Sequence, residues 1–332
     1  MHHTSVIIGG GMSGCLIALL LAAYRKPGED VAVIEPGQLG GSFSRGGFQY
    51  LRNSEGVRAL LDHHHLPYTL RPMRGGILTH KGRVLAYPAG LGDRTAQAQR
   101  LHYRKTRGTL EGFEPGVMNF GGEGGEQVLV DLSRLLMAVE RVATIYRAQV
   151  SVVSGPMACI GPRRWVEASG GHLVSTLPLP LLARILQLDE EEAPRCRHET
   201  LNVARIPLTE DNAPLGHYDY TYTPWLEAIH RVRPVNGASG VELELEWNAA
   251  LDVEDDQDGV SLPNTPVTRD IDKLAGALDT LEVRTMPGHL HPVEWGTWRP
   301  EPPLRLAGRF AQWEPRMTVD KVADAWYKEL NQ

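Results

Sequence analysis

Three glycines near the start of the chain have the spacing of a phosphate-binding turn. They are Gly9, Gly11 and Gly14, in the pattern G-x-G-x-x-G. The first glycine of such a turn permits a tight bend, the second lets the backbone approach a pyrophosphate, and the third lets a helix pack closely on a strand. Met12 and Ser13 stand at the expected start of that helix, whose free N–H groups and positive dipole end would face the phosphates. The pattern predicts a dinucleotide site.

The elements that must position this turn surround it in the required order. Residues 6–8 form a short apolar run typical of a buried strand, and residues 31–34 form a second one. Glu35 ends the second run, 21 residues after Gly14, where a carboxylate can accept hydrogen bonds from a ribose diol. Because an acid at this position disfavours a 2′-phosphate, FAD or NAD is favoured over NADP.

A second glycine-rich stretch, residues 36–48, indicates which dinucleotide is bound. It contains Gly40, Gly41 and Ser42. An NAD domain has no obvious need for such a stretch, whereas a flavin enzyme needs small residues where its backbone passes close to a long cofactor. A flexible surface loop is the alternative. At this point the chain resembles the superfamily of FAD-dependent amine oxidases, protoporphyrinogen oxidases and UDP-galactopyranose mutases, which share a glycine fingerprint, an acid and a Gly-Gly pair.

Two later segments extend the resemblance along the whole chain. Residues 172–180 look like the family's late Rossmann strand and place Thr176 beside the cofactor. Residues 304–310 are similar to its last FAD motif, in which Gly308 would allow a close approach and Arg309 would pair with phosphate or flavin oxygens. A helix is expected from Thr318 to Leu330 after this motif. The resemblance also implies that Val142 pairs its backbone with adenine.

The chain departs from each named group. Gln38-Leu39 stands where the mutases carry a histidine, and Ser42 stands where the large amine oxidases usually carry an arginine. A cysteine motif for covalent flavin is also missing from the sequence. We therefore expect non-covalent FAD, and neither group's substrate can be carried over.

The resemblance implies an α/β fold with a Rossmann-type, glutathione-reductase-like FAD-binding domain and an inserted α+β substrate domain. The FAD-binding domain is expected to be discontinuous, with pieces at residues 1–75, 121–190 and 296–332. The substrate domain would take residues 76–120 and 191–295. The first of these insertions is rich in Lys, Arg and His, which suggests an anionic ligand, although a charged surface without a special role is an equal alternative.

Composition excludes several classes of protein. The formal net charge of −6 argues against an overall basic nucleic-acid binder, and the longest apolar run, residues 15–23, is too short to span a bilayer. The three cysteines form no CxxC pattern, which predicts a reducing compartment without disulfides. The consecutive histidines 63–65 have poor geometry for a metal. We expect a cytoplasmic protein without a metal site or membrane segment.

Candidate catalytic residues lie in the second insertion. Tyr220 would share one face of a strand with Tyr218 and Tyr222, either lining a substrate slot or packing on a helix. His230 is a candidate base, and Arg231 is a candidate partner for a substrate carboxylate or phosphate.

Taken together, these features predict an FAD-dependent oxidoreductase of the amine-oxidase-like group. It would oxidise a C–N or C–C bond of an anionic or nucleotide-linked small molecule through flavin N5. One alternative is a non-redox flavin enzyme resembling UDP-galactopyranose mutase. Another is a flavoenzyme that acts on a modified nucleic-acid base, with the basic insertion following the phosphates. A flavin-binding scaffold without turnover is the last. The sequence does not predict an oligomeric state.

Overall fold

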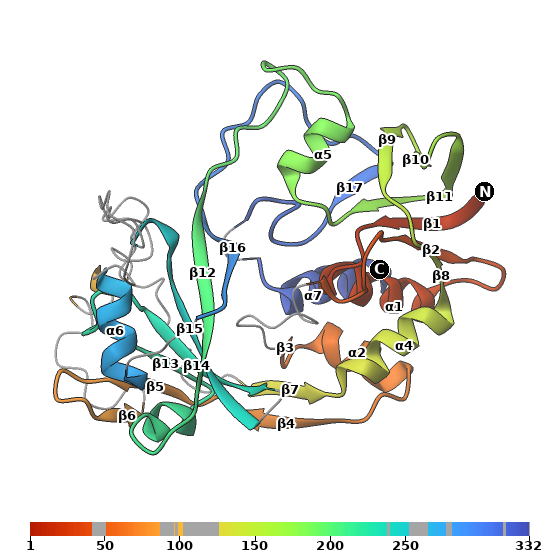
Figure 1. The fold of residues 1–332 in the computed structure, drawn as a ribbon. Helices are drawn as coiled ribbons and strands as arrows, with labels where there is room; N and C mark the ends of the chain where they lie inside the picture. Colours follow the sequence, from red (N-terminus) through yellow and green to blue (C-terminus); the bar gives the residue numbers. More distant parts are fainter. Residues whose placement is uncertain are drawn as a thin grey trace. The chain divides into compact units, whose positions relative to one another are not determined.

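The chain divides into two compact units (Figure 1). The computed structural model describes residues 1–41, 51–86, 96, 99–101, 126–237, 240–251, 265–276, 281–314 and 317–331. Unit 1 comprises Met1–Arg71, Glu126–Arg197 and Pro292–Gln332, and unit 2 comprises Pro72–Gly125 and His198–His291. The boundaries expected from the sequence lie within seven residues of these limits. The division by itself assigns no role to either unit.

Unit 1 is built on a seven-stranded sheet with the order β8-β2-β1-β11-β10-β9, in which β17 also pairs with β11. Its strands are β1 (His2–Ile8), β2 (Val31–Ile34), β8 (Ala143–Tyr146), β9 (Val150–Ser154), β10 (Met157–Ile160), β11 (Arg164–Ser175) and β17 (Leu304–Leu306). The strands β8, β2, β1, β11 and β17 are parallel to one another, whereas β9 and β10 are antiparallel additions. This is the arrangement of a Rossmann-type sheet with a β-meander.

One strand of this sheet differs from the sequence prediction. The late Rossmann strand was expected within residues 172–180, but β11 is continuous from Arg164 to Ser175. Its first half pairs with β10 and its second half with β17, while β1 runs beside both halves. Residues 169–172, which include two glycines, continue this strand without a break.

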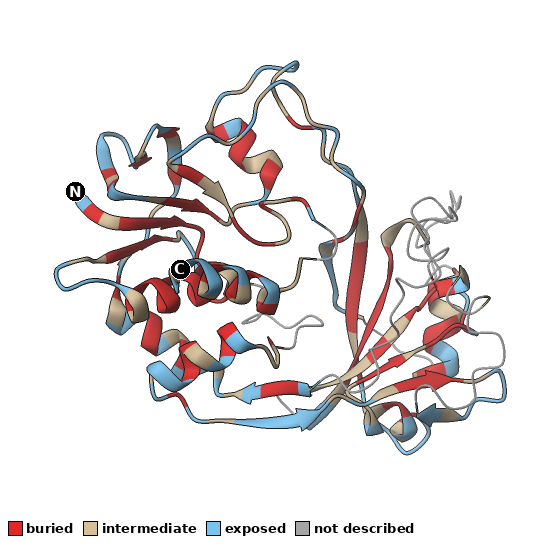
Figure 2. Ribbon diagram, turned by 180° about the vertical axis from the view of Figure 1, so that it is seen from behind, coloured by how far each residue is buried: buried red, intermediate tan, exposed pale blue. Residues whose placement is uncertain are grey.

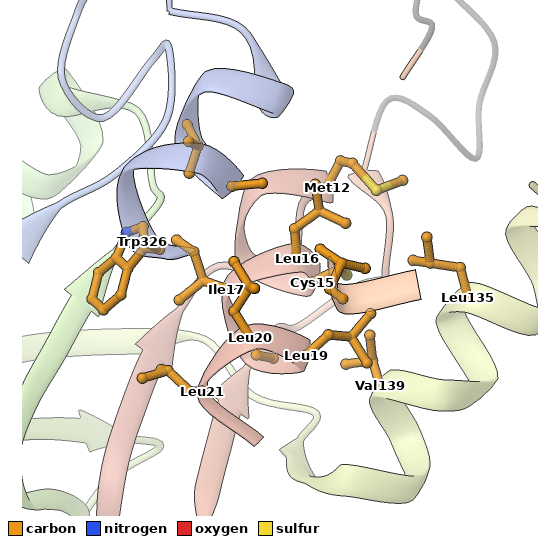
Figure 3. Close-up of a cluster of buried hydrophobic side chains, with 14 of the residues drawn as sticks. Met12, Cys15, Leu16, Ile17, Leu19, Leu20, Leu21, Leu135, Val139 and Trp326 are labelled. Atoms are coloured by element: carbon orange, nitrogen blue, oxygen red, sulfur yellow. The ribbon is translucent and has the colours of Figure 1, made fainter. Parts of the chain in front are cut away.

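Helices cover one face of the sheet in unit 1. They are α1 (Met12–Tyr24), α2 (Glu55–His63), α4 (Leu132–Val142) and α7 (Val319–Leu330), which gather on one side of the strands in Figure 1. Helix α1 is apolar all round because it lies between the sheet and the other helices, so residues 15–20 are completely buried (Figure 3). The opposite face packs on β9, β10 and α5 (Leu179–Ile185). Figure 2 shows the buried residues along the central strands. Unit 1 therefore has three layers.

A small second sheet completes unit 1. It has the order β3-β7-β4, with β3 (Leu51–Arg52), β7 (Glu126–Val130) and β4 (Tyr68–Pro72). Among the helices of the described ranges, none has the length and apolar character needed to cross a membrane.

Unit 2 contains a sheet with the order β16-β12-β15-β14-β13-β5-β6, in which only β13 and β5 are parallel among the described pairings. Its elements are β5 (Gly75–Leu78), β6 (Val84–Ala86), β12 (His198–Pro207), β13 (Tyr220–Tyr222), β14 (Arg231–Gly237), β15 (Gly240–Asn248), β16 (Val283–Leu290), α6 (Pro266–Ala275) and the short 3-10 helices Ala213–His217 and Ala249–Leu251. One face is apolar and packs on α6, with Leu243, Leu245 and Trp247 at its centre. The other face carries charged side chains.

The lowered pKa values of two histidines in unit 1 lead to a prediction of how the stability of the fold depends on pH. His64 donates a hydrogen bond from Nε2 to the carbonyl of Leu19 at 2.8 Å, and its burial lowers its pKa. Burial also lowers the pKa of His172, and nearby Arg305 lowers it further. Because the unfolded chain protonates first as the pH falls, the free energy of unfolding should decrease as the pH drops below about 6.5. Urea titrations at several pH values test this, and H64Q/H172Q should show a weaker pH dependence. Equal slopes for the two proteins would contradict it.

Candidate cofactor site

The glycine turn lies where the strand order of the unit 1 sheet reverses. The chain passes from β1 outward through β2 to β8 on one side and through β11 to β17 on the other, so the switch point lies between the carboxyl ends of β1 and β11. Open α/β sheets bind ligands at such a point. The turn follows β1 directly, and Thr176 follows β11 directly.

Two of the three fingerprint glycines are required by the packing of the chain itself. Gly9 has a φ of +102°, and a Cβ on it would lie 2.5 Å from the hydroxyl oxygen of Thr176. A Cβ on Gly14 would overlap the carbonyl oxygen of Gly9. These residues therefore let β1, α1 and β11 approach one another, as the sequence suggested for Gly14.

Gly11 is different, because nothing in the described chain requires a glycine there. Its φ of −63° and ψ of 176° are open to any residue, and a Cβ on it would meet no described atom within 4 Å. It is the N-cap residue of α1, so the space lies directly at the N-terminus of that helix. A side chain here would fill the place from which the first N–H groups of α1 can bind an anion.

The Gly-Gly pair lies against this space. Gly40 donates its N–H to the carbonyl of Gly10 at 2.8 Å, and Gly11 and Gly40 form a parallel bridge. A Cβ on Gly41, whose φ is +57°, would come within 3.3 Å of the Cα of Gly11. The two glycine-rich stretches thus meet. Ser42, the next predicted residue, lies outside the described residues.

Glu35 lies at the end of β2 beside the glycine turn. Its carboxylate accepts hydrogen bonds from the N–H of Gly10 at 2.7 Å and from the N–H of Gly37 at 2.8 Å, one at each oxygen. Each carboxylate oxygen has a second lone pair, so the group is held in place and can still accept from a ribose diol.

The last predicted motif reaches the first turn of α1 from the far end of the sequence. Gly308 follows β17 with a φ of +100°, and a Cβ on it would lie 2.9 Å from Oγ of Ser13. Its N–H is bound by the side chain of Gln312 at 3.2 Å. Arg309 is half-buried, with its guanidinium carbon 5.4 Å from the ring centre of Phe310. The structure therefore brings Gly308 to Ser13, and Arg309 is the next residue along the chain.

Thr176 supports the turn through its hydroxyl, which donates to the carbonyl of Gly9 at 2.8 Å. Replacing it with valine keeps the shape but leaves this carbonyl without the hydroxyl donor. We expect Thr176→Val to lower the free energy of unfolding by about 1 kcal/mol, measured by urea denaturation. Thr176→Ser keeps the hydroxyl and serves as the control. A loss in the serine variant equal to that in the valine variant would show that the methyl group matters instead.

Val142 does not lie at this site. It is the last residue of α4 and precedes β8, in which Ala143 pairs with Val31 and Tyr146 pairs with Ile34. Val142 is therefore at the amino edge of the parallel strands, whereas the glycine turn is at their carboxyl edge. The resemblance that suggested Val142 gave no indication of which end of the following strand faces the cofactor.

Arg147 is a residue that the sequence reading missed. It follows β8 at the carboxyl edge, and its Nη1 donates to the carbonyl of Gly37 at 2.5 Å. Its position next to the loop after Glu35 makes it a candidate neighbour of the nucleotide. The sequence feature that could have identified it is a cationic residue directly after the end of a strand.

The three tyrosines of unit 2 do not share a face. Tyr220 lies over Gly75, whereas the ring of Tyr218 lies over Gly76 beside Thr221. Because Gly75 and Gly76 are consecutive in β5, their Cβ directions point to opposite faces of the sheet. Tyr218 precedes the strand, which starts only at Tyr220, so the alternation that we extrapolated back to Tyr218 does not apply.

His230 and Arg231 are both bound by one carboxylate. Nε2 of His230 lies 2.7 Å from Oε1 of Glu246, and Arg231 forms an ion pair with the other oxygen of Glu246. All three side chains are largely buried, and Tyr220 is 2% exposed. The structure thus gives these candidate catalytic residues a partner that the sequence did not reveal.

The comparisons with known proteins address the fold. No protein-family model matches the chain, and no curated protein does so at a significant level. Solved structures match over its whole length. A putrescine oxidase has a TM-score of 0.61 at 12% identity, covering 100% of this chain and 98% of its own. A reduced UDP-galactopyranose mutase has a TM-score of 0.60 at 12% identity, covering 99% and 95%. A fatty acid isomerase from P. acnes has a TM-score of 0.62 at 10% identity, covering 99% and 98%.

These matches define the class of fold. The chain has the mixed α/β architecture of the Rossmann-type FAD-binding flavoenzymes, and the predicted fold class is confirmed. The likeness expected from the sequence is confirmed at the level of the fold, because an amine-oxidising protein and a UDP-galactopyranose mutase are both among the similar structures. Identities of 10 to 12% carry this statement no further than the fold.

Proposed function

We propose that this protein is a flavoenzyme that binds FAD non-covalently at the carboxyl edge of the unit 1 sheet. The observation that carries the proposal is the open space at Gly11. Within the part of the chain that the structure describes, no atom requires a glycine at this position, whereas a pyrophosphate approaching the N-terminus of α1 does need one.

The residues around this space fit the parts of the cofactor. The amides of Met12, Ser13 and Gly14 would hold the pyrophosphate, and Glu35 would hold the ribose of the adenosine half. Gly40, Gly41 and Gly308 would allow the chain to pass close to the cofactor, and Arg309 would pair with phosphate or flavin oxygens. When bound, FAD supplies hydride or electron-pair chemistry at N5, and the protein orients the substrate and excludes water.

The finer proposal is an oxidoreductase acting on a C–N or C–C bond of an anionic or nucleotide-linked substrate. The basic segment of unit 2 supports the anionic character of the substrate. A non-redox reaction is the second candidate, because the similar folds include a mutase and an isomerase as well as an oxidase.

The first test is a visible absorption spectrum of the purified protein, repeated on the supernatant after acid precipitation. We expect a flavin spectrum that moves completely into the supernatant. A colourless protein that cannot be reconstituted with FAD would contradict the proposal. Flavin that stays with the precipitate would contradict non-covalent binding. The substrates are then tested by adding amines or UDP-sugars under anaerobic conditions. Bleaching of the bound flavin would indicate an oxidoreductase, because the substrate itself reduces the flavin. A mutase would show no bleaching, because it requires flavin that has been reduced beforehand.

A further inference from the structure

An exposed tryptophan in unit 2 lies against an arginine and a histidine, and the histidine belongs to a turn that carries two further basic residues. Trp225 is 38% exposed. The guanidinium carbon of Arg100 lies 4.4 Å from the centre of its ring, and the ring of His80 meets it edge-on at 5.6 Å. His80 begins a turn that also carries Lys81 and Arg83, all three exposed. We call these five residues the Trp225 patch.

The loop that carries Trp225 is firmly built. The carboxylate of Asp270, which is completely buried, accepts hydrogen bonds from the N–H groups of Glu227, Ala228 and Ile229 at 2.9, 2.6 and 3.1 Å. Thr223 donates from its hydroxyl to the carbonyl of Ile229 at 2.6 Å. The indole is therefore held at the surface by an ordered loop. Its exposed part is therefore available for stacking against a flat ring of a partner.

The charge of the surrounding sequence identifies the kind of partner. Residues 72–110 contain eight Lys and Arg and two His but only one acid, Asp93, in a chain whose net charge is −6. Arg100 and the turn at His80–Arg83 belong to this segment, and the fold places Arg100 and His80 against Trp225, which comes from a distant segment. Such a concentration of positive charge attracts a polyanion.

We propose that the Trp225 patch binds single-stranded nucleic acid. A base would stack on the indole and the Arg100 guanidinium, and Lys81 and Arg83 would pair with phosphates on either side. Sites for single strands combine these two features, a stacking platform and cations that follow the backbone. An acidic protein would satisfy the charges but gives no reason for an exposed indole held in place by its loop. This inference does not depend on the flavin.

The test measures the fluorescence anisotropy of a labelled oligothymidine and of an abasic strand of equal length. We expect Trp225→Ala to weaken binding of the oligothymidine about tenfold or more and to leave binding of the abasic strand unchanged. Trp225→Phe should retain most of the affinity. Trp165→Ala is the matched control, since Trp165 is also 38% exposed but lies on β11 in unit 1. The double variant K81Q/R83Q should reduce the salt slope by about 1.4, as expected for two lost contacts to single-strand phosphates.

The proposal would be overturned by no binding to either strand at low salt, by equal affinity of Trp225→Ala and Trp165→Ala, or by equal affinity of the wild type for the two strands. Stronger, Trp225-dependent binding to anionic vesicles would overturn it in favour of a membrane surface. The flavin spectrum of each preparation is recorded alongside, so a failure of the proposed FAD site is seen separately.

Discussion

Replacing Gly11 with alanine should abolish or strongly weaken FAD binding while leaving the fold unchanged. The alanine Cβ would enter space that no described atom approaches within 4 Å, and the backbone angles suit alanine as well as glycine. The apo protein should therefore lose little or no stability. Once a pyrophosphate occupies this space, the added methyl forces the phosphate away from the N–H groups of α1. Overpacking of this kind costs about 1–3 kcal/mol, which corresponds to roughly a 5- to 150-fold loss of affinity.

The measurement compares FAD affinity by fluorescence titration with the thermal midpoint of the apo protein. Gly14→Ala is the contrasting variant, because its Cβ would overlap the carbonyl oxygen of Gly9, and it should destabilise the apo fold itself. Unchanged FAD affinity in Gly11→Ala would show that the phosphates lie elsewhere. Equal destabilisation of both apo variants would show that Gly11 serves the fold and not a ligand.

The contrast between these glycines also shows how far the sequence alone can go. The fingerprint, its strands and Glu35 lie within one local βαβ unit, so spacing was sufficient to predict them. The approach of Gly308 to Ser13 joins segments almost a chain length apart, and only the family resemblance indicated it. The pattern could not reveal which of the three glycines serves packing and which faces open space, because this depends on atoms from Thr176 and the carbonyl of Gly9.

Two errors have the same origin in non-local structure. Val142 was assigned to the site from its position along the chain, but the direction of β8 places it at the other edge of the sheet. Tyr218 was assigned to the face of Tyr220 by alternation, but the strand starts at Tyr220. Periodicity predicts which residues alternate within an element. It does not predict where the element starts or which edge carries a ligand.

The partner of His230 and Arg231 was likewise out of reach of the sequence, and it has a large expected effect. Glu246 binds both residues from the neighbouring strand, at a relative side-chain exposure of 7%. A neutral side chain in its place leaves the buried Arg231 guanidinium and the His230 imidazole without this carboxylate. Removing one member of a buried ion pair typically costs about 3–5 kcal/mol, so we expect Glu246→Gln to lower the free energy of unfolding by that amount.

Urea denaturation at neutral pH measures this loss, with Glu282→Gln as the matched control. Glu282 pairs with Arg284 at 3.1 Å, but its side chain is 80% exposed, so its removal should cost less than about 1 kcal/mol. R231M/E246L removes both charges of the ion pair together and should recover part of the stability, because apolar replacement of a buried pair is far less costly than breaking it.

A loss in Glu246→Gln as small as that in Glu282→Gln would show that the charged face of unit 2 is stabilised by other contacts. In that case the predictions that His230 is a base and that Arg231 binds a substrate carboxylate or phosphate would be the ones to test next. A full loss identifies their first role as holding β14 to β15.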